Sequence, residues 1–341
     1  IVELGESAND KGTQAVGIIM RAWMFSLLTD TYGDIPYSEA IRAKEGIYYT
    51  KYDSQEDIYN GILAELKTAN DLLAGASGKV GGDLFYGGDL TKWRKLANSL
   101  RVRYLIRISS KKSPAAELAN ILANPANNPI FESNSDNAVY LYKSASPDQF
   151  PLYTTRSGSF NEFRASKTLL DTLKSLGDPR LTIFFRATPA TESTANPEFI
   201  GIPNGLDDVT AQTYAGGQQN HSRIGALYYE DAITPKGLSI AMGVVMTYAE
   251  LQFLLAEAAS KSWITGNTET FYNASITSSF QFYGFSVSQN YLSLPQVTLT
   301  GNATDDQKKI GFQKWISFFY QGMEAWYDWR RTRIPALTPA V

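Results

Sequence analysis

Apolar residues recur at three- and four-residue steps in separate stretches of this 341-residue chain, and this period constrains the fold more than any other feature. The period predicts helices over residues 14–31, 54–73, 91–109, 114–123, 166–176, 248–261, 268–283 and 304–332. Ser54 and Thr247 each stand three positions before an acidic residue, which is the arrangement of a capping box at a helix start. The sequence therefore predicts an all-α fold.

Long irregular stretches separate these helices. Residues 124–165 and 177–245 are rich in Pro, Gly, Asn and Thr without a sustained period, so we expect loops that carry short strands at most. Irregular stretches of this length are usually functional in a compact domain. We expect a single domain over residues 1–341, with helical elements near 14–31, 54–109, 247–283 and 304–332.

One helix pair shows the spacing of a known repeat. Trp93-x-x-Leu96-Ala97-x-x-Leu100 follows the tetratricopeptide pattern W-x2-L-G-x2-Y, with Ala in place of Gly and Leu in place of Tyr. No regular 34-residue period runs along the chain. The pattern therefore favours degenerate, non-contiguous helix pairs over a regular solenoid.

Composition excludes several kinds of chemistry. The chain has no cysteine and one histidine, His221, which removes thiol catalysis, disulfides and the common zinc sites. Its 31 basic and 34 acidic residues form no run of five like charges, so an extended nucleic-acid or anionic-membrane surface is not expected. No apolar stretch reaches the ~20 residues of a membrane span, and the start at Ile1 without a leader suggests a processed or trimmed N-terminus.

Five segments in this order resemble the SusD/RagB family of cell-surface glycan-binding lipoproteins, in particular its SusD-like branch. They are LLTDTYGDIPY at 27–37, WRKLANSLR at 93–101, DPRL at 178–181, MTYAELQFLLAEAA at 246–259, and KW through EAW to RRT over 314–332. The resemblance implies four tetratricopeptide-like helix pairs with irregular ligand loops beside them, and no catalysis. It also implies capture of an oligosaccharide or peptide and its delivery to a TonB-dependent SusC-like transporter, which the helical repeats face.

The resemblance also predicts the location of the protein. Members of the family carry a lipobox cysteine near their start, so we expect an anchor cysteine upstream of Ile1 and further residues beyond Val341. The implied location is the outer membrane, as a surface-exposed lipoprotein.

Aromatic side chains in the loops are the candidate ligand contacts, because a flat ring packs against the C–H face of a sugar while amides and carboxylates bond its hydroxyls. Three clusters qualify: Tyr48, Tyr49 and Tyr52 with Lys51 and Asp53; Tyr140, Tyr142, Phe150 and Tyr153 with Asn134, Asp136, Asn137, Asp148 and Gln149; and Tyr214 with Gln218, Gln219, Asn220 and His221. The alternative is that these rings pack loops onto the core. We expect one or two of the clusters to contact ligand, and we expect His221 to lie at the surface or to bond the ligand.

Tryptophans and charged residues on the helices have structural interpretations. Within periodic apolar patterns, Trp23, Trp93, Trp315, Trp326 and Trp329 predict core packing, and Trp263 is intermediate. The motif residues Arg101, Arg103, Glu250, Glu257, Arg330 and Arg331 predict guanidinium–carboxylate pairs between helices. The alternative for Glu250 and Glu257, two turns apart on one helix, is a catalytic carboxylate pair.

The function that these observations favour is non-catalytic binding of a glycan nutrient without a cofactor. The sequence leaves open whether the protein has a calcium site. Residues 134–137 and 204–208 supply oxygen ligands, but they do not follow the EF-hand pattern and are typical turn residues. The alternatives are a helical-repeat protein–protein adaptor, a peptide-binding member of the same family and, last, a carboxylate-based glycosidase. The sequence does not identify the glycan, since a tyrosine ring stacks on many sugars.

Overall fold

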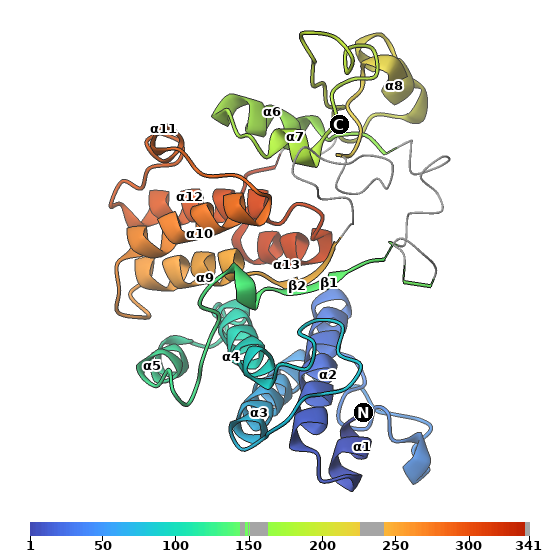
Figure 1. The fold of residues 1–341 in the computed structure, drawn as a ribbon, viewed down its shortest axis with the longest axis vertical. Helices are drawn as coiled ribbons and strands as arrows, with labels where there is room; N and C mark the ends of the chain where they lie inside the picture. Colours follow the sequence, from blue (N-terminus) through green and yellow to red (C-terminus); the bar gives the residue numbers. More distant parts are fainter. Residues whose placement is uncertain (144–146, 149, 151–162, 226–241, 338–341) are drawn as a thin grey trace. The chain divides into compact units, whose positions relative to one another are not determined.

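The structure of the chain is a computed structural model that describes residues 1–143, 147–148, 150, 163–225 and 242–337. These residues are mostly helical, with one two-stranded sheet in which β1 (Ala138–Leu141) pairs with β2 (Met242–Met246) (Figure 1). The α-helices are α1 (Val2–Ser7), α2 (Lys11–Tyr32), α3 (Gln55–Ala74), α4 (Leu90–Arg107), α5 (Ala115–Ala123), α6 (Lys167–Leu176), α7 (Leu181–Phe184), α8 (Asp208–Thr213), α9 (Tyr248–Ser260), α10 (Thr268–Phe282), α11 (Gln289–Leu292), α12 (Ala303–Ser317) and α13 (Gly322–Thr332). The predicted all-α class is confirmed.

The described residues divide into two compact units, each assembled from segments far apart in sequence. Unit 1 comprises Ile1–Ala138, Met246–Ser275 and Tyr320–Arg333. Unit 2 comprises the described residues of 139–245 and 276–319, together with 334–337. The expected single domain over residues 1–341 stays a prediction.

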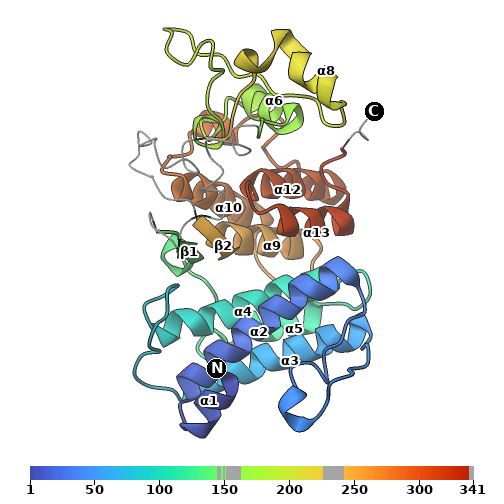
Figure 2. The same cartoon turned by 90° about the vertical axis from the view of Figure 1, so that its right-hand side faces the viewer.

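Unit 1 is built on α2, α3 and α4, which lie lengthwise beside one another (Figure 2). The α2 helix begins where the Asp10 carboxylate accepts a hydrogen bond from the Thr13 amide at 3.0 Å, and it ends at Gly33, whose φ of 80° suits glycine. The predicted apolar stripe of α3, including Ile58, Ile62 and Leu66, is fully buried. Burying each such side chain stabilises the fold by roughly 1.5–3 kcal/mol.

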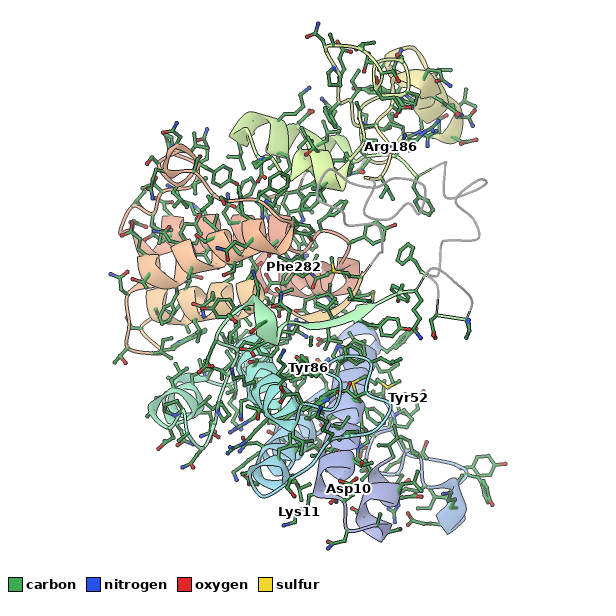
Figure 3. The ribbon with its side chains drawn as sticks, viewed as in Figure 1. Asp10, Lys11, Tyr52, Tyr86, Arg186 and Phe282 are labelled. Atoms are coloured by element: carbon green, nitrogen blue, oxygen red, sulfur yellow. The ribbon has the colours of Figure 1, made fainter. Side chains whose placement is uncertain are left out.

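The glycine-rich connection between α3 and α4 is organised by one carboxylate. Asp83 accepts hydrogen bonds from the amides of Phe85, at 2.8 Å, and Gly88, at 2.9 Å, and from the Trp93 indole N–H, at 2.8 Å. Tyr86, labelled in Figure 3, packs edge-on against the Trp93 ring. The connection is therefore irregular but anchored to the core of unit 1.

The single helix predicted over residues 304–332 is wrong. The chain forms α12 and α13 instead, and Tyr320 between them has a left-handed φ of 62°. Within unit 2, Phe319 stacks on Phe184 with ring centroids 4.0 Å apart. This tertiary contact follows the end of α12, and a continuous apolar period does not reveal such an interruption.

The tryptophans divide into three groups. Trp93 is buried as predicted, whereas the full burial predicted for Trp23, Trp315 and Trp329 is wrong, since they are half-buried, as is Trp263, for which an intermediate position was predicted. The core position predicted for Trp326 is wrong, since its side chain is 42% exposed and the Arg330 guanidinium lies 4.7 Å from its ring centroid. A cation placed over the ring face gives this indole a partner that the apolar pattern did not include.

In unit 2, the DPRL segment forms a buried ion pair. The Arg180 Nη2 donates to Asp178 Oδ2 at 2.6 Å, and its Nη1 donates to Ser279 Oγ at 2.7 Å. Tyr291 donates its hydroxyl to the same Asp178 oxygen at 3.0 Å. The guanidinium also lies over the Phe280 ring, at 4.4 Å from its centroid. This motif therefore joins α7 to the end of α10 and to α11.

The irregular region also contains helices that the sequence did not predict. The α7 helix has four residues and α8 has six, and 3₁₀ turns at Tyr214–Gly216 and Gln218–Asn220 follow α8. Isolated bridges such as Phe185 to Ile224 complete the described part of this region. Helices this short span too few turns to produce a recognisable apolar period.

Candidate functional site

The first predicted cluster lies on the loop between α2 and α3, in unit 1. The side chains of Tyr48, Tyr49 and Tyr52 project into solvent, and Tyr49 is 98% exposed (Tyr52 is labelled in Figure 3). Asp53 holds the end of this loop by accepting hydrogen bonds from the Ser38 amide, at 2.7 Å, and the Ser38 hydroxyl, at 2.9 Å. The Ser38 amide also holds the pKa of Asp53 below its usual value. The loop thus presents three solvated rings with no wall around them.

The second cluster begins at Tyr140 within β1, continues beyond the strand in unit 2, and forms a chain of rings. Tyr140 and Tyr142 meet edge to face with centroids 4.9 Å apart, and Tyr142 meets Phe150 in the same way at 5.5 Å. All three rings are half-buried, so part of each side chain is accessible to solvent. Burial, with Tyr140 beside it, raises the pKa of Tyr142, which keeps its hydroxyl protonated as a hydrogen-bond donor.

Polar groups flank this chain of rings. The Lys143 ammonium pairs with Asp148 Oδ2 at 2.7 Å, and the Lys143 amide donates to the Asp148 carbonyl at 2.7 Å. On β2, a Cβ added at Gly243 would lie 3.3 Å from the Tyr142 hydroxyl, which is tighter than ordinary contact. Gly243 was not among the residues predicted for this cluster, although a glycine inside a strand is the usual sign of a close approach. Tyr153 and Gln149, assigned to this cluster, lie outside the described residues.

The third cluster folds onto itself. His221 is 1% exposed, and its Nε2 lies 2.6 Å from the Tyr214 carbonyl oxygen, so this nitrogen carries the proton and donates it. Asn220 donates its side-chain amide to the Ala215 carbonyl at 2.9 Å. The surface position expected for His221 is therefore wrong, because the ring is used inside the loop. Gln218 and Gln219 are exposed and Tyr214 is half-buried.

The charged residues of the family motifs form buried pairs between helices of unit 1. Arg103 on α4 donates to both Glu250 oxygens on α9, at 2.5 and 2.6 Å, and Arg331 on α13 donates to both Glu257 oxygens, at 2.6 and 2.7 Å. Burial opposes the charge on Arg103, but Glu250 and Glu324 outweigh it and raise its pKa above the usual value. The predicted interhelical pairing is confirmed for these two arginines.

The other two arginines bond differently. Arg101 donates to the side-chain oxygens of Asn98, at 2.9 Å, and Asn128, at 3.0 Å, and burial lowers its pKa. Arg330 donates to the Asp30 backbone carbonyl at 2.7 Å. The predicted interhelical pairing is present for Arg101, whose Nη2 lies 3.7 Å from Glu117 Oε2 on α5, whereas the contact of Arg330 is with a backbone carbonyl.

Glu250 and Glu257 are not arranged as a catalytic carboxylate pair. Each is almost fully buried, and both oxygens of each carboxylate accept hydrogen bonds from a guanidinium. Neither oxygen pair is thus free to protonate a leaving group or to attack a sugar.

Metal and membrane features can be assessed for the described part of the chain. No group of three or more His, Asp or Glu side chains there could hold a metal ion, and this includes residues 134–137 and 204–208. Among the same residues, no helix has the length and apolarity needed to cross a membrane.

The described residues form a mostly helical fold with one two-stranded sheet, and this fold is tetratricopeptide-like. Over residues 1–341, the chain matches the SusD-like family described as starch-binding and associating with the outer membrane. The chain belongs to this family, which confirms the resemblance seen in its sequence.

Solved structures support the same assignment, whereas a search among curated proteins finds no match. A chitin-binding protein is 31% identical, with a TM-score of 0.77, and the match covers 97% of this chain and 70% of that one. A SusD homologue from Bacteroides fragilis is 29% identical, with a TM-score of 0.81 and coverage of 98% and 75%. A second SusD homologue from that organism is 26% identical, with a TM-score of 0.82 and coverage of 96% and 73%.

Proposed function

We propose that this protein binds an oligosaccharide nutrient at the bacterial surface, without catalysis, through the ring cluster of Tyr140, Tyr142 and Phe150. The single observation that carries the proposal is the chain of three half-buried rings beside the Lys143–Asp148 pair. It combines accessible ring surface with polar groups that can bond sugar hydroxyls. Membership of a starch-binding family supports a glycan as the ligand, and the chitin-binding relative extends the candidates to amino sugars.

The tyrosine loop and the Tyr214 loop are secondary candidates. Tyr48, Tyr49 and Tyr52 offer ring area without a concave wall, so a sugar there would stay largely solvated. His221 would act indirectly in the third cluster, by holding the backbone of Tyr214. We therefore place the ring cluster of unit 2 first.

Delivery of the glycan to a TonB-dependent SusC-like transporter is the second part of the proposal. Met24, Leu28 and Tyr32 are exposed at four-residue steps on α2, and together they form an apolar stripe on one face of unit 1. Exposed apolar side chains at helical spacing suit a protein partner better than water. We place the transporter contact on this stripe, and the outer-membrane location through a lipid anchor upstream of Ile1.

Calorimetry with maltohexaose and chitohexaose tests the binding proposal. Tyr142→Ala should weaken binding of the recognised oligosaccharide by about tenfold, since a stacked ring contributes roughly 1–2 kcal/mol. Tyr49→Ala is the matched control, because it removes an equal ring from unit 1, and its affinity should stay within about twofold of the wild type. The opposite ranking of the two variants would move the site to the tyrosine loop.

The alternative functions predict different outcomes. A protein–protein adaptor would bind no glycan and would retain partner capture in Tyr142→Ala, and a peptide-binding member of the family would bind only the peptides of a mixed panel. A glycosidase would release reducing ends from the bound oligosaccharide.

We also propose that glycan binding needs no metal ion. EDTA should therefore leave the measured affinity unchanged, and a calcium-dependent affinity would contradict this.

A further inference from the structure

Unit 1 contains a cavity of about 580 Å³ that the proposed function does not use. Its walls come from the C-terminal ends of α2, α4 and α13 and from the N-terminal end of α3. We call it the basic pocket, because the residues described around it include five cationic side chains and two carboxylates. Its volume lies within the range of about 300–1,000 Å³ typical of small-ligand sites.

Two of the five cations are neutralised within the fold. Arg107 pairs with Asp30 at 2.6 Å and also with Glu324, while Arg331 pairs with Glu257 at 2.6 Å. Burial opposes the charge on Arg107, but Glu324 and Asp30 raise its pKa well above the usual value. These groups form the floor of the basic pocket and have no charge left for a ligand.

The other three cations lie at the rim. Lys111 and Lys112 follow α4 and are exposed, and within the described chain no carboxylate lies within ion-pair distance of either ammonium. Arg330 is exposed on α13. Against these three charges the rim holds one carboxylate, that of Glu56. The rim is thus left with a net positive charge.

Arg330 is held in position before any ligand arrives. One of its N–H groups donates to the Asp30 carbonyl at 2.7 Å, and its guanidinium lies 4.7 Å from the Trp326 ring centroid. A guanidinium carries five N–H donors in a plane, so its fork can still bond an oxyanion bidentately. Basic side chains at helix ends also stabilise the helix dipole, but that role needs neither a cavity nor a guanidinium fixed by two contacts.

The neutral side chains around the rim indicate what accompanies the negative charge. Asn60 and Ser110 are exposed there, beside the Glu56 carboxylate. Amide, hydroxyl and carboxylate groups match a ligand rich in hydroxyls. We propose that the basic pocket binds an acidic saccharide unit, with Lys111, Lys112 and Arg330 around its carboxylate or sulfate group.

Trp326 supplies a local signal for the test, because an anion bound at Arg330 changes the environment of the indole beneath it. Trigalacturonate and a sulfated trisaccharide are titrated separately into the protein, with a neutral trisaccharide as the reference. We expect saturable fluorescence change with one or both acidic sugars and none with the neutral sugar. The acidic sugar that binds more tightly shows whether the basic pocket prefers a carboxylate or a sulfate group. Trp326→Phe should abolish the signal while calorimetric binding persists.

Two double variants, each of which removes two positive charges, distinguish binding at the basic pocket from general electrostatic attraction. Lys111→Met combined with Lys112→Met should weaken binding of the acidic sugar by at least about tenfold. The control combines Lys11→Met with Lys79→Met, two exposed lysines at the opposite end of α2 and α3, and should change affinity by less than about twofold. Thermal unfolding of both variants verifies that they fold.

Three results would overturn the proposal: equal weakening in the control variant, equal affinity for the neutral sugar, or equal affinity for hexaglutamate, which would indicate an acidic-peptide site. The affinities are measured from the Trp326 signal in the Tyr142→Ala background, which weakens neutral-sugar binding at the ring cluster of unit 2 and should leave binding at the basic pocket unchanged.

Discussion

Two buried ion pairs, one in each unit, join residues at very different sequence separations. In unit 1, Arg103 and Glu250 are 147 positions apart and join α4 to α9. In unit 2, Asp178 and Arg180 are two positions apart and pair within one turn, and the same two side chains also contact Ser279 and Tyr291. The first pair can form only when the helices have assembled, whereas the second can form locally. The Arg103–Glu250 pair therefore depends on tertiary assembly, whereas the Asp178–Arg180 pair depends on local structure.

Breaking the long-range pair should produce the largest effect. Glu250→Gln leaves the buried Arg103 guanidinium without its bidentate partner, and should lower the free energy of unfolding by about 3–5 kcal/mol. Urea unfolding measures the loss. Asp71→Asn is the control, because it breaks an exposed pair with Lys67 on α3 and should cost about 0–1 kcal/mol. Equal losses in the two variants would show that the buried pair contributes no more to stability than the exposed pair.

Removing the local pair should cost somewhat less. Arg180→Met leaves Asp178 buried, but Tyr291 still donates a hydrogen bond to its carboxylate, so we expect a loss of about 2–4 kcal/mol. Hydrogen exchange should become faster in α6 and in the second half of α10, both in unit 2, and should be unchanged in α3 and α4. Equally faster exchange in all four helices would show that the units unfold as one, and would weaken the comparison.

Alkaline pH should destabilise unit 1 through its tyrosines, since burial raises the pKa of Tyr59, Tyr86 and Tyr104. Tyr104 on α4 contacts the Ser26 hydroxyl of α2 at 2.7 Å, and burial raises its pKa to about 12. Because this value exceeds that of an unfolded tyrosine, the stabilising contribution is fully present below about pH 10 and is lost as the pH rises towards 12. Its size is roughly 2–3 kcal/mol at 1.36 kcal/mol per pKa unit.

Unfolding free energies at pH 9 and pH 11.5 measure this contribution. Tyr104→Phe cannot ionise, so its stability should fall less steeply between these pH values than that of the wild type. Ser26→Ala removes the hydroxyl partner but retains the titrating ring, and should keep the steep dependence. A wild-type slope in Tyr104→Phe would assign the alkaline loss to other groups.

The candidate site was only partly predictable. The sequence placed Tyr140, Tyr142 and Phe150 in one cluster because they are close along the chain, and the structure brings their rings into contact. Gly243 was missed because it comes from a distant strand. The same limit applies to the basic pocket, which combines residues from four helices, so no local pattern marks it.

The sequence by itself determined where most of the long helices lie and that the charged residues of the family motifs include buried guanidinium–carboxylate pairs. Periodic apolar residues and capping side chains act within a few positions, so α2, α3, α4 and α9 can be recognised locally. Only the tertiary structure decided that Arg103 pairs with Glu250, that a turn at Tyr320 divides α12 from α13, and that His221 is buried under its own loop. Each of these depends on packing between residues distant in sequence, where contact geometry and desolvation act and local propensity carries no information.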